Sequence, residues 1–493
     1  MRVKVVSRGS DLAVLQAGRV ARALGARWPD LDVETTTRSS RGDRDRRVAL
    51  WDAPDKGLFT EDLSHALVAG DADIAVHSWK DLPVSGYAGT TIAGTLERAD
   101  PRDVLLIRRT VVDARPASLA VLSSSPRRAW QMGQSLAPLL PWPCGSIAAH
   151  PVRGNIPTRL RKLLAGDGDA LVVAKAALDR LLSPDSKPDV ARDIRNALGQ
   201  CAWMVLPLRQ FPTAPAQGAL AIEIAASRTD LADRVQAVTH EPTRLAVEAE
   251  RAILASYGGG CHEAIGATVL LREYGRITSL RGQLPNGEVL QDWSLTRSGS
   301  ATVPPRTDAS HVWPGPDERQ GAERRPLSTA VPAHARALWI ARADALPLDY
   351  RPSDSQLVWT AGLRSWERLA RRGVWVHGSS DGLGDQESPD VDLMAGTSPE
   401  WIRLTHDRSD APGALATYSV RYVLPDDLAA RTHFFWMSGS LFREALDRHP
   451  GIGGAWHASG PGRTARALHD TLGSTSRVST WLDYDQWHQN VTL

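Results

Sequence analysis

The first 298 residues alternate short apolar runs with stretches in which apolar residues recur every three or four positions. Ser10 stands where an N-cap is required, and the residues after it predict an amphipathic helix. The apolar positions of that helix are Ala13, Ala17, Val20 and Leu24, and a second helix is indicated by Phe59, Leu63 and Leu67. Strands are predicted at 3–6, 31–37, 74–76 and 171–174. Strands that alternate with helices indicate parallel pairing in βαβ units, and so an α/β fold.

Polar clusters follow several of the predicted strands. They occupy residues 7–10, 77–83, 123–128 and 150–159, and they contain five arginines, several serines and the pair Lys80-Asp81. Ligands of open α/β sheets bind beyond the carboxyl ends of the strands. Any single cluster is also compatible with an ordinary capped turn. Together they predict a cleft for a ligand with several carboxylates or phosphates, bound by arginine forks and helix N-termini.

Asp81 is the carboxylate of this predicted cleft. Surrounded by cations it would stay ionised, and it could stabilise a developing positive charge or donate a proton. The structural alternative is a salt bridge to Lys80 or to one of the arginines.

Cys261 follows three consecutive glycines, in the segment YGGGCHE at 257–263. Glycines let a backbone approach a ligand closely and leave the sulfur accessible. A cysteine in an ordinary core is the alternative, and His262 would serve as a base for the thiol only if the fold brought the two together in space. Cys144 and Cys201 lack such a setting and are interpreted as structural.

Composition narrows the class of protein. The chain has 493 residues, of which 42% are hydrophobic and 23% charged, which is typical of a globular protein of about three domains. The net charge of +2 does not indicate a nucleic-acid partner, and three scattered cysteines indicate neither a disulfide framework nor a metal site. No apolar run reaches the roughly 20 residues of a spanning helix, and no signal-peptide pattern opens the chain. We expect a cytoplasmic monomer without a membrane or nucleic-acid partner.

A stretch rich in proline, glycine, serine and charge separates two regions of the chain. It runs from 299 to 336 and is predicted to be a linker, because it holds too little apolar surface to form a core. Strand-like segments, serine or glycine turns and amphipathic helices resume at 337 and continue to 493. A further α/β domain is therefore predicted there.

The motifs of the first region resemble those of porphobilinogen deaminase (hydroxymethylbilane synthase), an enzyme of porphyrin and heme biosynthesis. They run in that family's order and include SRGSDLAVLQA (7–17), DADIAVHSWKDLP (71–83), ERADPRDVL (97–105), SSSPRRAWQ (123–131), VRGNIPTRLRKL (152–163) and EAERAILASYGGGCHEAIGA (248–267). The resemblance implies two lobes like those of periplasmic binding proteins, at 1–98 with 198–238 and at 99–197. It also implies a small α/β cofactor-attachment domain at 239–298.

The resemblance also implies the chemistry. Such a transferase condenses four porphobilinogen molecules, with loss of ammonia, onto a dipyrromethane cofactor held as a thioether, here on Cys261, and releases a linear tetrapyrrole. Asp81 matches the carboxylate that steadies pyrrole N–H groups and the cation left when ammonia departs. The other matching positions are Lys56 and Lys80 in the cleft; Ser125, Arg127 and Arg128 for the cofactor; and Arg8, Ser10, Gln16, Phe59, Arg153 and Arg159 for the substrate.

Residues 337–493 resemble uroporphyrinogen-III synthase, which closes the linear tetrapyrrole into a ring with one pyrrole inverted. The turns Ser438-Gly-Ser440 and Gly460-Pro-Gly-Arg-Thr464 carry the resemblance, which would place Tyr418 or Tyr422 in the same cleft. The protein would then be bifunctional. A non-catalytic appendage is the alternative for this region, and a solute-receptor-like protein that binds polyanions is the alternative for the whole chain.

Overall fold

The computed structural model describes residues 1–38, 60–258, 264–298, 303–316, 322–385, 387–473 and 476–493. Its fold is mixed α/β, with sheets of five, five, three, six and four strands in these residues. None of the helices in the described ranges is long and apolar enough to cross a membrane.

The first five-stranded sheet forms lobe 1. Its strand order is β2-β1-β3-β10-β4, and α1 packs on it with the apolar face that the sequence predicts, Ala17, Val20 and Leu24 being buried. The strands are β1 (Arg2–Arg8), β2 (Asp32–Arg38), β3 (Ile74–Ser78), β4 (Thr90–Gly94) and β10 (Leu220–Ala225). The helices are α1 (Asp11–Arg27), α3 (Glu61–Val68) and α9 (Thr229–Gln236).

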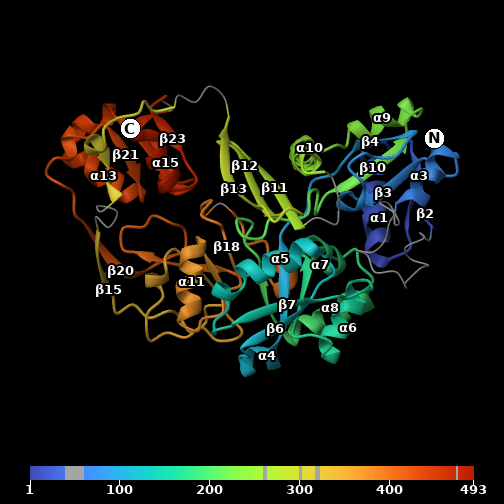
Figure 1. The fold of residues 1–493 in the computed structure, drawn as a ribbon, viewed down its shortest axis with the longest axis horizontal. Coiled ribbons are helices and arrows are strands. Elements are labelled where there is room, and N and C mark those ends of the chain that lie inside the picture. Colours follow the sequence, from blue (N-terminus) through green and yellow to red (C-terminus); the bar gives the residue numbers. More distant parts are fainter. Residues whose placement is uncertain (39–59, 259–263, 299–302, 317–321, 386, 474–475) are drawn as a thin grey trace.

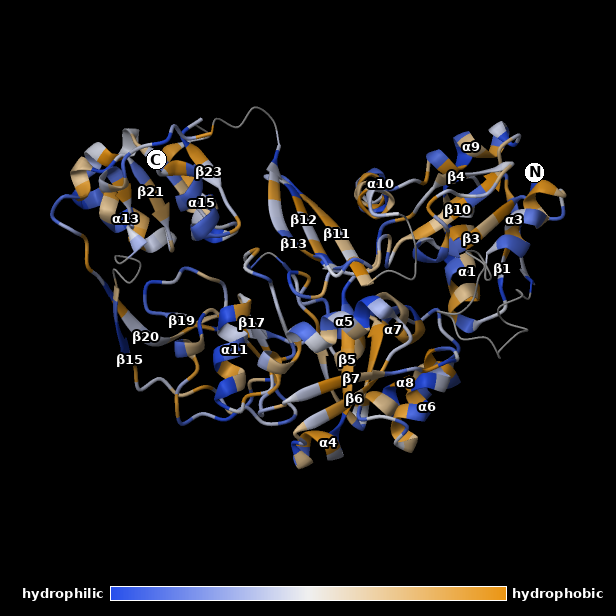
Figure 2. Cartoon of the chain, viewed as in Figure 1, coloured by the Kyte–Doolittle hydropathy of each residue, from blue (hydrophilic) through white to orange (hydrophobic). Residues whose placement is uncertain are grey.

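The second five-stranded sheet forms lobe 2, in the order β7-β6-β8-β5-β9. Hydrophobic residues follow its strands, whereas the helices around it alternate hydrophobic and hydrophilic faces (Figure 2). The strands are β5 (Asp103–Arg108), β6 (Ser118–Leu122), β7 (Ser146–His150), β8 (Ala170–Ala174) and β9 (Cys201–Val205). The helices are α4 (Arg109–Ala114), α5 (Pro126–Ser135), α6 (Ile156–Ala165), α7 (Lys175–Leu182) and α8 (Pro188–Gly199).

The parallel pairing predicted from the alternation of strands and helices is confirmed for β1 with β2 and β3 and for β6 with β7 and β8, but each lobe also contains one antiparallel strand. In lobe 1, β10 runs antiparallel to β3 and β4, and in lobe 2, β5 runs antiparallel to β8 and β9. The reason is the path of the chain. It leaves lobe 1 after β4 and returns at β10, and the strand with which it enters each lobe from a crossover, β5 in lobe 2 and β10 in lobe 1, runs opposite to its neighbours.

Two crossovers connect the lobes, residues 95–102 and 206–219, and they lie against each other. Ala99 N donates to Gly218 O over 3.3 Å. A Cβ atom on Gly218, whose φ is +90°, would lie 2.4 Å from Ala99 O, so only glycine permits this approach. The fully buried Glu250 joins both crossovers, because it accepts hydrogen bonds from the Arg98 guanidinium and from Ala216 N.

A three-stranded antiparallel sheet follows the lobes, in the order β11-β12-β13. Its strands are β11 (Ala264–Arg272), β12 (Gly275–Gln283) and β13 (Val289–Arg297), and α10 (Glu241–Ser256) leads into it. In Figure 1 this sheet stands between lobe 1 and the C-terminal part of the chain.

The C-terminal part contains two sheets rather than one. The six-stranded sheet has the order β15-β20-β19-β16-β17-β18, and the four-stranded sheet has the order β14-β21-β22-β23. The strands are β14 (Val312–Trp313), β15 (Ala322–Pro326), β16 (Ala337–Ile340), β17 (Leu357–Thr360), β18 (Gly378–Ser379), β19 (Trp401–His406), β20 (Ala414–Tyr422), β21 (His433–Trp436), β22 (Trp456–Ser459) and β23 (Val478–Thr480). The helices are α11 (Leu363–Arg371), α12 (Asp392–Ala395), α13 (Gly439–Arg448), α14 (Arg463–Leu472) and α15 (Tyr484–Val491).

The segment 299–336, predicted to be a linker, is therefore partly structural. It contributes β14 to the four-stranded sheet, where β14 pairs with β21, and β15 to the six-stranded sheet, where β15 pairs with β20. Two reasons explain the difference. The edge strand β15 gains its hydrogen bonds from the main chain and requires little apolar surface of its own, whereas β14 is a short pair of buried apolar residues, Val312 and Trp313, inside a polar stretch.

Lobe 2 and the six-stranded sheet share one hydrophobic core. Leu119, Leu136 and Leu139 of the lobe belong to the same buried cluster as Leu338 and Val358. Backbone and indole hydrogen bonds also cross the seam: Val205 N donates to His377 O over 2.8 Å, and Trp366 Nε1 donates to Leu139 O over 3.1 Å. The six-stranded sheet is therefore packed against lobe 2 rather than tethered to it.

Candidate functional site

The polar clusters lie at matching sheet edges. In lobe 1, β1 and β3 are parallel neighbours, so the segments that follow them, 9–10 and 79–83, leave from one edge. In lobe 2, β6 and β7 are likewise parallel. Serine and asparagine caps start the helices there: Ser10 accepts from Ala13 N, Ser125 from Arg128 N and Asn155 from Thr158 N.

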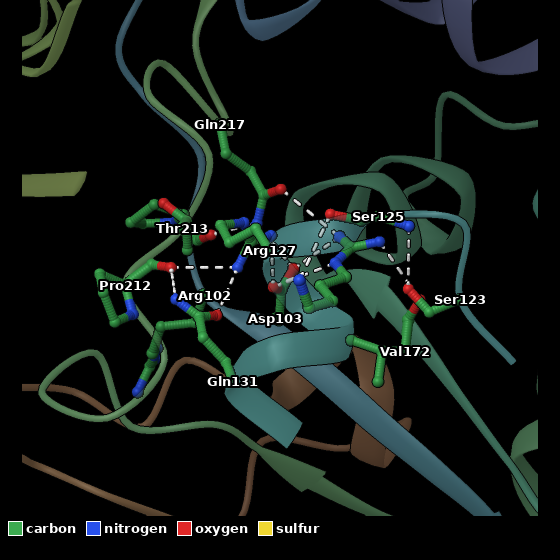
Figure 3. Close-up of polar contacts among 12 residues, drawn as sticks. Arg102, Asp103, Ser123, Ser125, Arg127, Gln131, Val172, Pro212, Thr213 and Gln217 are labelled. Atoms are coloured by element: carbon green, nitrogen blue, oxygen red, sulfur yellow. Dashed lines mark hydrogen bonds and ion pairs between the residues drawn. The ribbon is translucent and has the colours of Figure 1, made fainter. Parts of the chain in front are cut away.

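Asp103 is the buried centre of the lobe 2 side of the site (Figure 3). It is 1% exposed, and its carboxylate accepts from Arg127 Nη2 at 2.9 Å and from Arg128 Nη2 and Nε at 2.6 and 3.1 Å. The two guanidinium groups hold the pKa of Asp103 well below its usual range against the effect of burial. Arg127 also donates to Pro212 O and to the Gln131 side chain. Both arginines, predicted as ligands of cofactor carboxylates, thus serve Asp103 in this structure.

Gln217 connects Asp103 to lobe 1. Its amide nitrogen donates to Asp103 Oδ1 over 2.8 Å, and its amide oxygen accepts from Lys80 Nζ over 3.1 Å. Burial, together with the positive charge of Arg128, lowers the pKa of Lys80 to about 8. One side chain on the second crossover therefore holds together the charged groups of both lobes.

Asp81 ends a 3-10 turn, Trp79–Asp81, directly after β3. Its side chain is exposed, and within the described ranges its carboxylate has no hydrogen bond or ion pair. It is close enough to Arg159 to act on that guanidinium, whose pKa falls to about 10 because burial and the charge of Arg128 outweigh the effect of Asp81. Asp81 thus faces the cations without being paired to one of them.

The remaining predicted residues divide into three groups. Gln16 is buried and donates to Ser78 Oγ over 2.9 Å, so it positions the end of β3. Arg8 and Arg153 are half-buried, and Arg153 Nη2 is a buried donor without a partner in the described part of the chain. Lys56, Phe59 and Cys261 lie outside the described residues.

Comparison with known proteins points to one family. A family model described as "Porphobilinogen deaminase, dipyromethane cofactor binding domain" matches residues 3–233. A porphobilinogen deaminase from Chromobacterium violaceum is 36% identical over 302 residues, which are 61% of this chain and 88% of that protein. One from Moorella thermoacetica is 36% identical over 310 residues, 62% of this chain and 90% of that protein.

The chain belongs to the porphobilinogen deaminase family. Among solved structures, a TRAP periplasmic solute binding protein from Desulfovibrio salexigens is 12% identical, covers 52% of this chain and 77% of that one, and has a TM-score of 0.29. A likeness at that level carries no conclusion about this deaminase.

The residues present suit the dipyrromethane cofactor that the family model names. Among the described residues around the site, the four cations Lys80, Arg127, Arg128 and Arg159 face two carboxylates, Asp81 and Asp103. Arg153 Nη2 adds a buried donor without a partner in these ranges. A surplus of positive charge and an unused donor fit a ligand that brings carboxylates. The cofactor would supply the pyrrole carbon to which the substrate is joined.

Several residues that organise the deaminase site were missed from the sequence, above all Asp103, Gln217 and Glu250. Asp103 lies inside the motif ERADPRDVL, and an acid directly before the apolar run Val104–Ile107 was the available signal.

A buried pair in lobe 1 was also missed. The side chains of His77 and Glu223 lie 2.8 Å apart, and the Glu223 carboxylate also accepts hydrogen bonds from Ser64 and Thr90. No local pattern predicts such pairs, because their members lie 146 residues apart.

The C-terminal part holds a second polar cluster. Tyr422 Oη lies 2.6 Å from Ser440 Oγ and 3.1 Å from Ser438 Oγ, and Ser438 caps α13. A Cβ on Gly439 would lie 3.9 Å from Thr464 Cα, which places the turn beginning at Gly460 beside this cluster. Tyr418 lies elsewhere: it is buried in the core shared with lobe 2, whereas Tyr422 belongs to the core around Trp436.

Proposed function

We propose that the protein is an active porphobilinogen deaminase that condenses four porphobilinogen molecules into hydroxymethylbilane, with a dipyrromethane cofactor attached to Cys261. The observation that carries the proposal is the cluster of cations around the unpaired carboxylate of Asp81. Each pyrrole of the substrate carries an acetate and a propionate group, so a growing chain brings many carboxylates to this cleft.

Lys80, Arg153 and Arg159 would bind those carboxylates, since their donors have few protein partners. Arg127 and Arg128 would act mainly by holding Asp103 and by adding positive potential, and they would keep the cleft attractive to anions. Asp81 would stabilise the cation that forms on the substrate methylene group when ammonia leaves. A carboxylate beside that carbon would stabilise the transition state most, because that is where the charge develops.

A mass spectrum of the purified protein tests the cofactor assignment. We expect the intact chain to carry an adduct of two pyrrole units that maps to the peptide containing Cys261. The Cys261→Ala variant should lack the adduct, whereas Cys144→Ala should retain it. An active wild-type protein with unmodified Cys261 would overturn the assignment.

Steady-state kinetics test the role of Asp81. The Asp81→Ala variant should fold normally and should lose turnover by several orders of magnitude with a small change in KM, because the interaction it removes belongs to the transition state. A receptor that only binds polyanions would show no turnover in the wild type and unaltered binding in this variant.

We further propose that the C-terminal part is a uroporphyrinogen-III synthase, which would make the protein bifunctional. Two observations support this: the part is built from two α/β units joined through β15 and β20, and the Tyr422, Ser438 and Ser440 cluster lies beside the Gly460 turn. Fusion would raise the effective concentration of the labile linear product at the second site.

The isomer of the product tests this second proposal. Wild-type protein supplied with porphobilinogen should yield mainly type III uroporphyrin after oxidation, because unassisted ring closure gives type I. Point variants are preferable to truncation, which would expose the core shared with lobe 2. Tyr422→Phe should shift the product towards type I at an unchanged rate of porphobilinogen consumption, and Tyr350→Phe serves as the control. Type I from the wild type would show that the C-terminal part is an appendage.

A further inference from the structure

The segment that follows α11 and contains β18 contacts the deaminase at several places. We name residues 377–385 and 387–390 the brace. His377 O accepts from Val205 N over 2.8 Å, and Asp381 Oδ2 accepts from Leu208 N over 2.8 Å. Leu208 lies on the second crossover, and Val205 is the last residue of β9, directly before that crossover. The C-terminal part thus holds the chain where it leaves lobe 2.

The same brace reaches the first crossover. Pro389 O accepts from Arg102 Nη2 over 3.0 Å, and Asp390 Oδ2 lies 3.3 Å from Lys175 Nζ. Lys175 is fully buried at the start of α7 and also lies 3.5 Å from Asp100. Arg102 binds Asp100 through both carboxylate oxygens. A third contact is made to the three-stranded sheet, where Glu387 receives two hydrogen bonds from one guanidinium, that of Arg272.

The two crossovers carry or adjoin the residues that organise the site. Asp103 follows Arg102 directly, and Gln217 lies nine residues after Leu208. These two residues hold Arg127, Arg128 and Lys80. A rotation of the lobes about the crossovers would change the distance between Lys80 and Arg128, and so the shape of the cleft.

We propose that the brace sets the angle between the two lobes, and that Asp381 and Asp390 are positioning residues for the deaminase reaction. The catalytic part of this inference rests on the proposed deaminase activity, whereas the structural part does not. Asp381 adopts a φ of +52°, in the region that favours glycine. Such a conformation persists only where the surrounding structure enforces it. Here it presents the Asp381 carboxylate to Leu208 N.

Hydrogen exchange of the full-length protein tests the inference without reference to activity. Asp381→Ala and Asp390→Ala should each speed exchange at least tenfold in the crossovers, 95–102 and 206–219, and leave the central strands β1 and β6 unchanged. Asp381→Asn keeps the acceptor and tolerates a positive φ, so it should behave as wild type. Asp354→Ala is the matched control. Asp354 also lies in the C-terminal part, but its side chain is 95% exposed and its carboxylate is 4.0 Å from the Arg109 guanidinium.

The enzyme-bound intermediates supply the catalytic readout. Mass spectra of the protein during turnover resolve species that differ by one pyrrole unit, and the two alanine variants should accumulate one species at the expense of the later ones. Unchanged crossover exchange in both alanine variants would overturn the brace. Failure of the wild type to consume porphobilinogen would overturn the proposed function instead and would leave the exchange result as the test of the brace.

Discussion

Replacing Asp103 by Asn removes the negative charge on which two buried arginines depend. The Asp103 carboxylate accepts four hydrogen bonds, three from Arg127 and Arg128 and one from Gln217. Asn at this position turns one acceptor oxygen into an NH2 group that faces a guanidinium donor. Breaking a buried ion pair by removal of one partner costs about 3–5 kcal/mol. We expect the free energy of unfolding of the unit formed by lobe 2 and the six-stranded sheet to fall by about that amount.

Urea unfolding monitored by tryptophan fluorescence measures the loss, because Trp142 and Trp203 are buried in lobe 2. Asp81→Asn is the matched control: the carboxylate of Asp81 is exposed, so this variant should change stability by less than about 0.5 kcal/mol while it abolishes most turnover. A loss of under about 1 kcal/mol in Asp103→Asn would refute the reasoning, since it would mean that the two arginines find other partners or solvent.

Three other variants probe the electrostatics and the crossovers. Because the pKa of Lys80 is lowered to about 8, Lys80 loses its positive charge as the pH rises through 8. Porphobilinogen binding to the Cys261→Ala protein, measured by calorimetry, should weaken over that range. In the Lys80→Arg variant the binding should persist to higher pH. Burial raises the pKa of Asp381 to about 6, so the folded state binds this proton more tightly than the unfolded state. The free energy of unfolding should therefore decrease as the pH rises from 4 to 6, by up to about 1.4 kcal/mol per pH unit from this group. This decrease should be smaller in Asp381→Asn, which has no carboxyl group to titrate. Gly218→Ala places a Cβ 2.4 Å from Ala99 O and should cost about 2–3 kcal/mol in urea unfolding, whereas Gly199→Ala, which meets no atom within 4 Å, should not.

Local periodicity predicted the elements of the lobes well because it reports burial directly. The cap at Ser10, the buried face of α1 and the apolar strands β1, β3 and β8 all follow from spacing within one element. The reversed direction of β5 and β10 did not follow, since it depends on how the chain crosses between the lobes. The edge strand β15 was missed because it carries little apolar signal, and β14 was missed because its two apolar residues are too few to show a period.

The candidate site was predictable where the chemistry lies on one turn. Lys80 and Asp81 stand together after β3, and Ser125 and Arg128 stand together at the start of α5. What the sequence could not supply was the partner of each charge. Asp103 reaches its arginines only because the fold brings the start of α5 beside the first residue of β5, and no spacing within the sequence encodes that contact.

The core that lobe 2 shares with the six-stranded sheet matters during synthesis on the ribosome. Leu139 and Trp366 contact each other across 227 residues of sequence. At 5–20 residues per second, about 10–45 s separate the emergence of the two. Throughout that interval the nascent chain displays an unfinished apolar face. We therefore expect the newborn first half to depend on chaperones, and premature termination within the second half to yield aggregates rather than a smaller working enzyme.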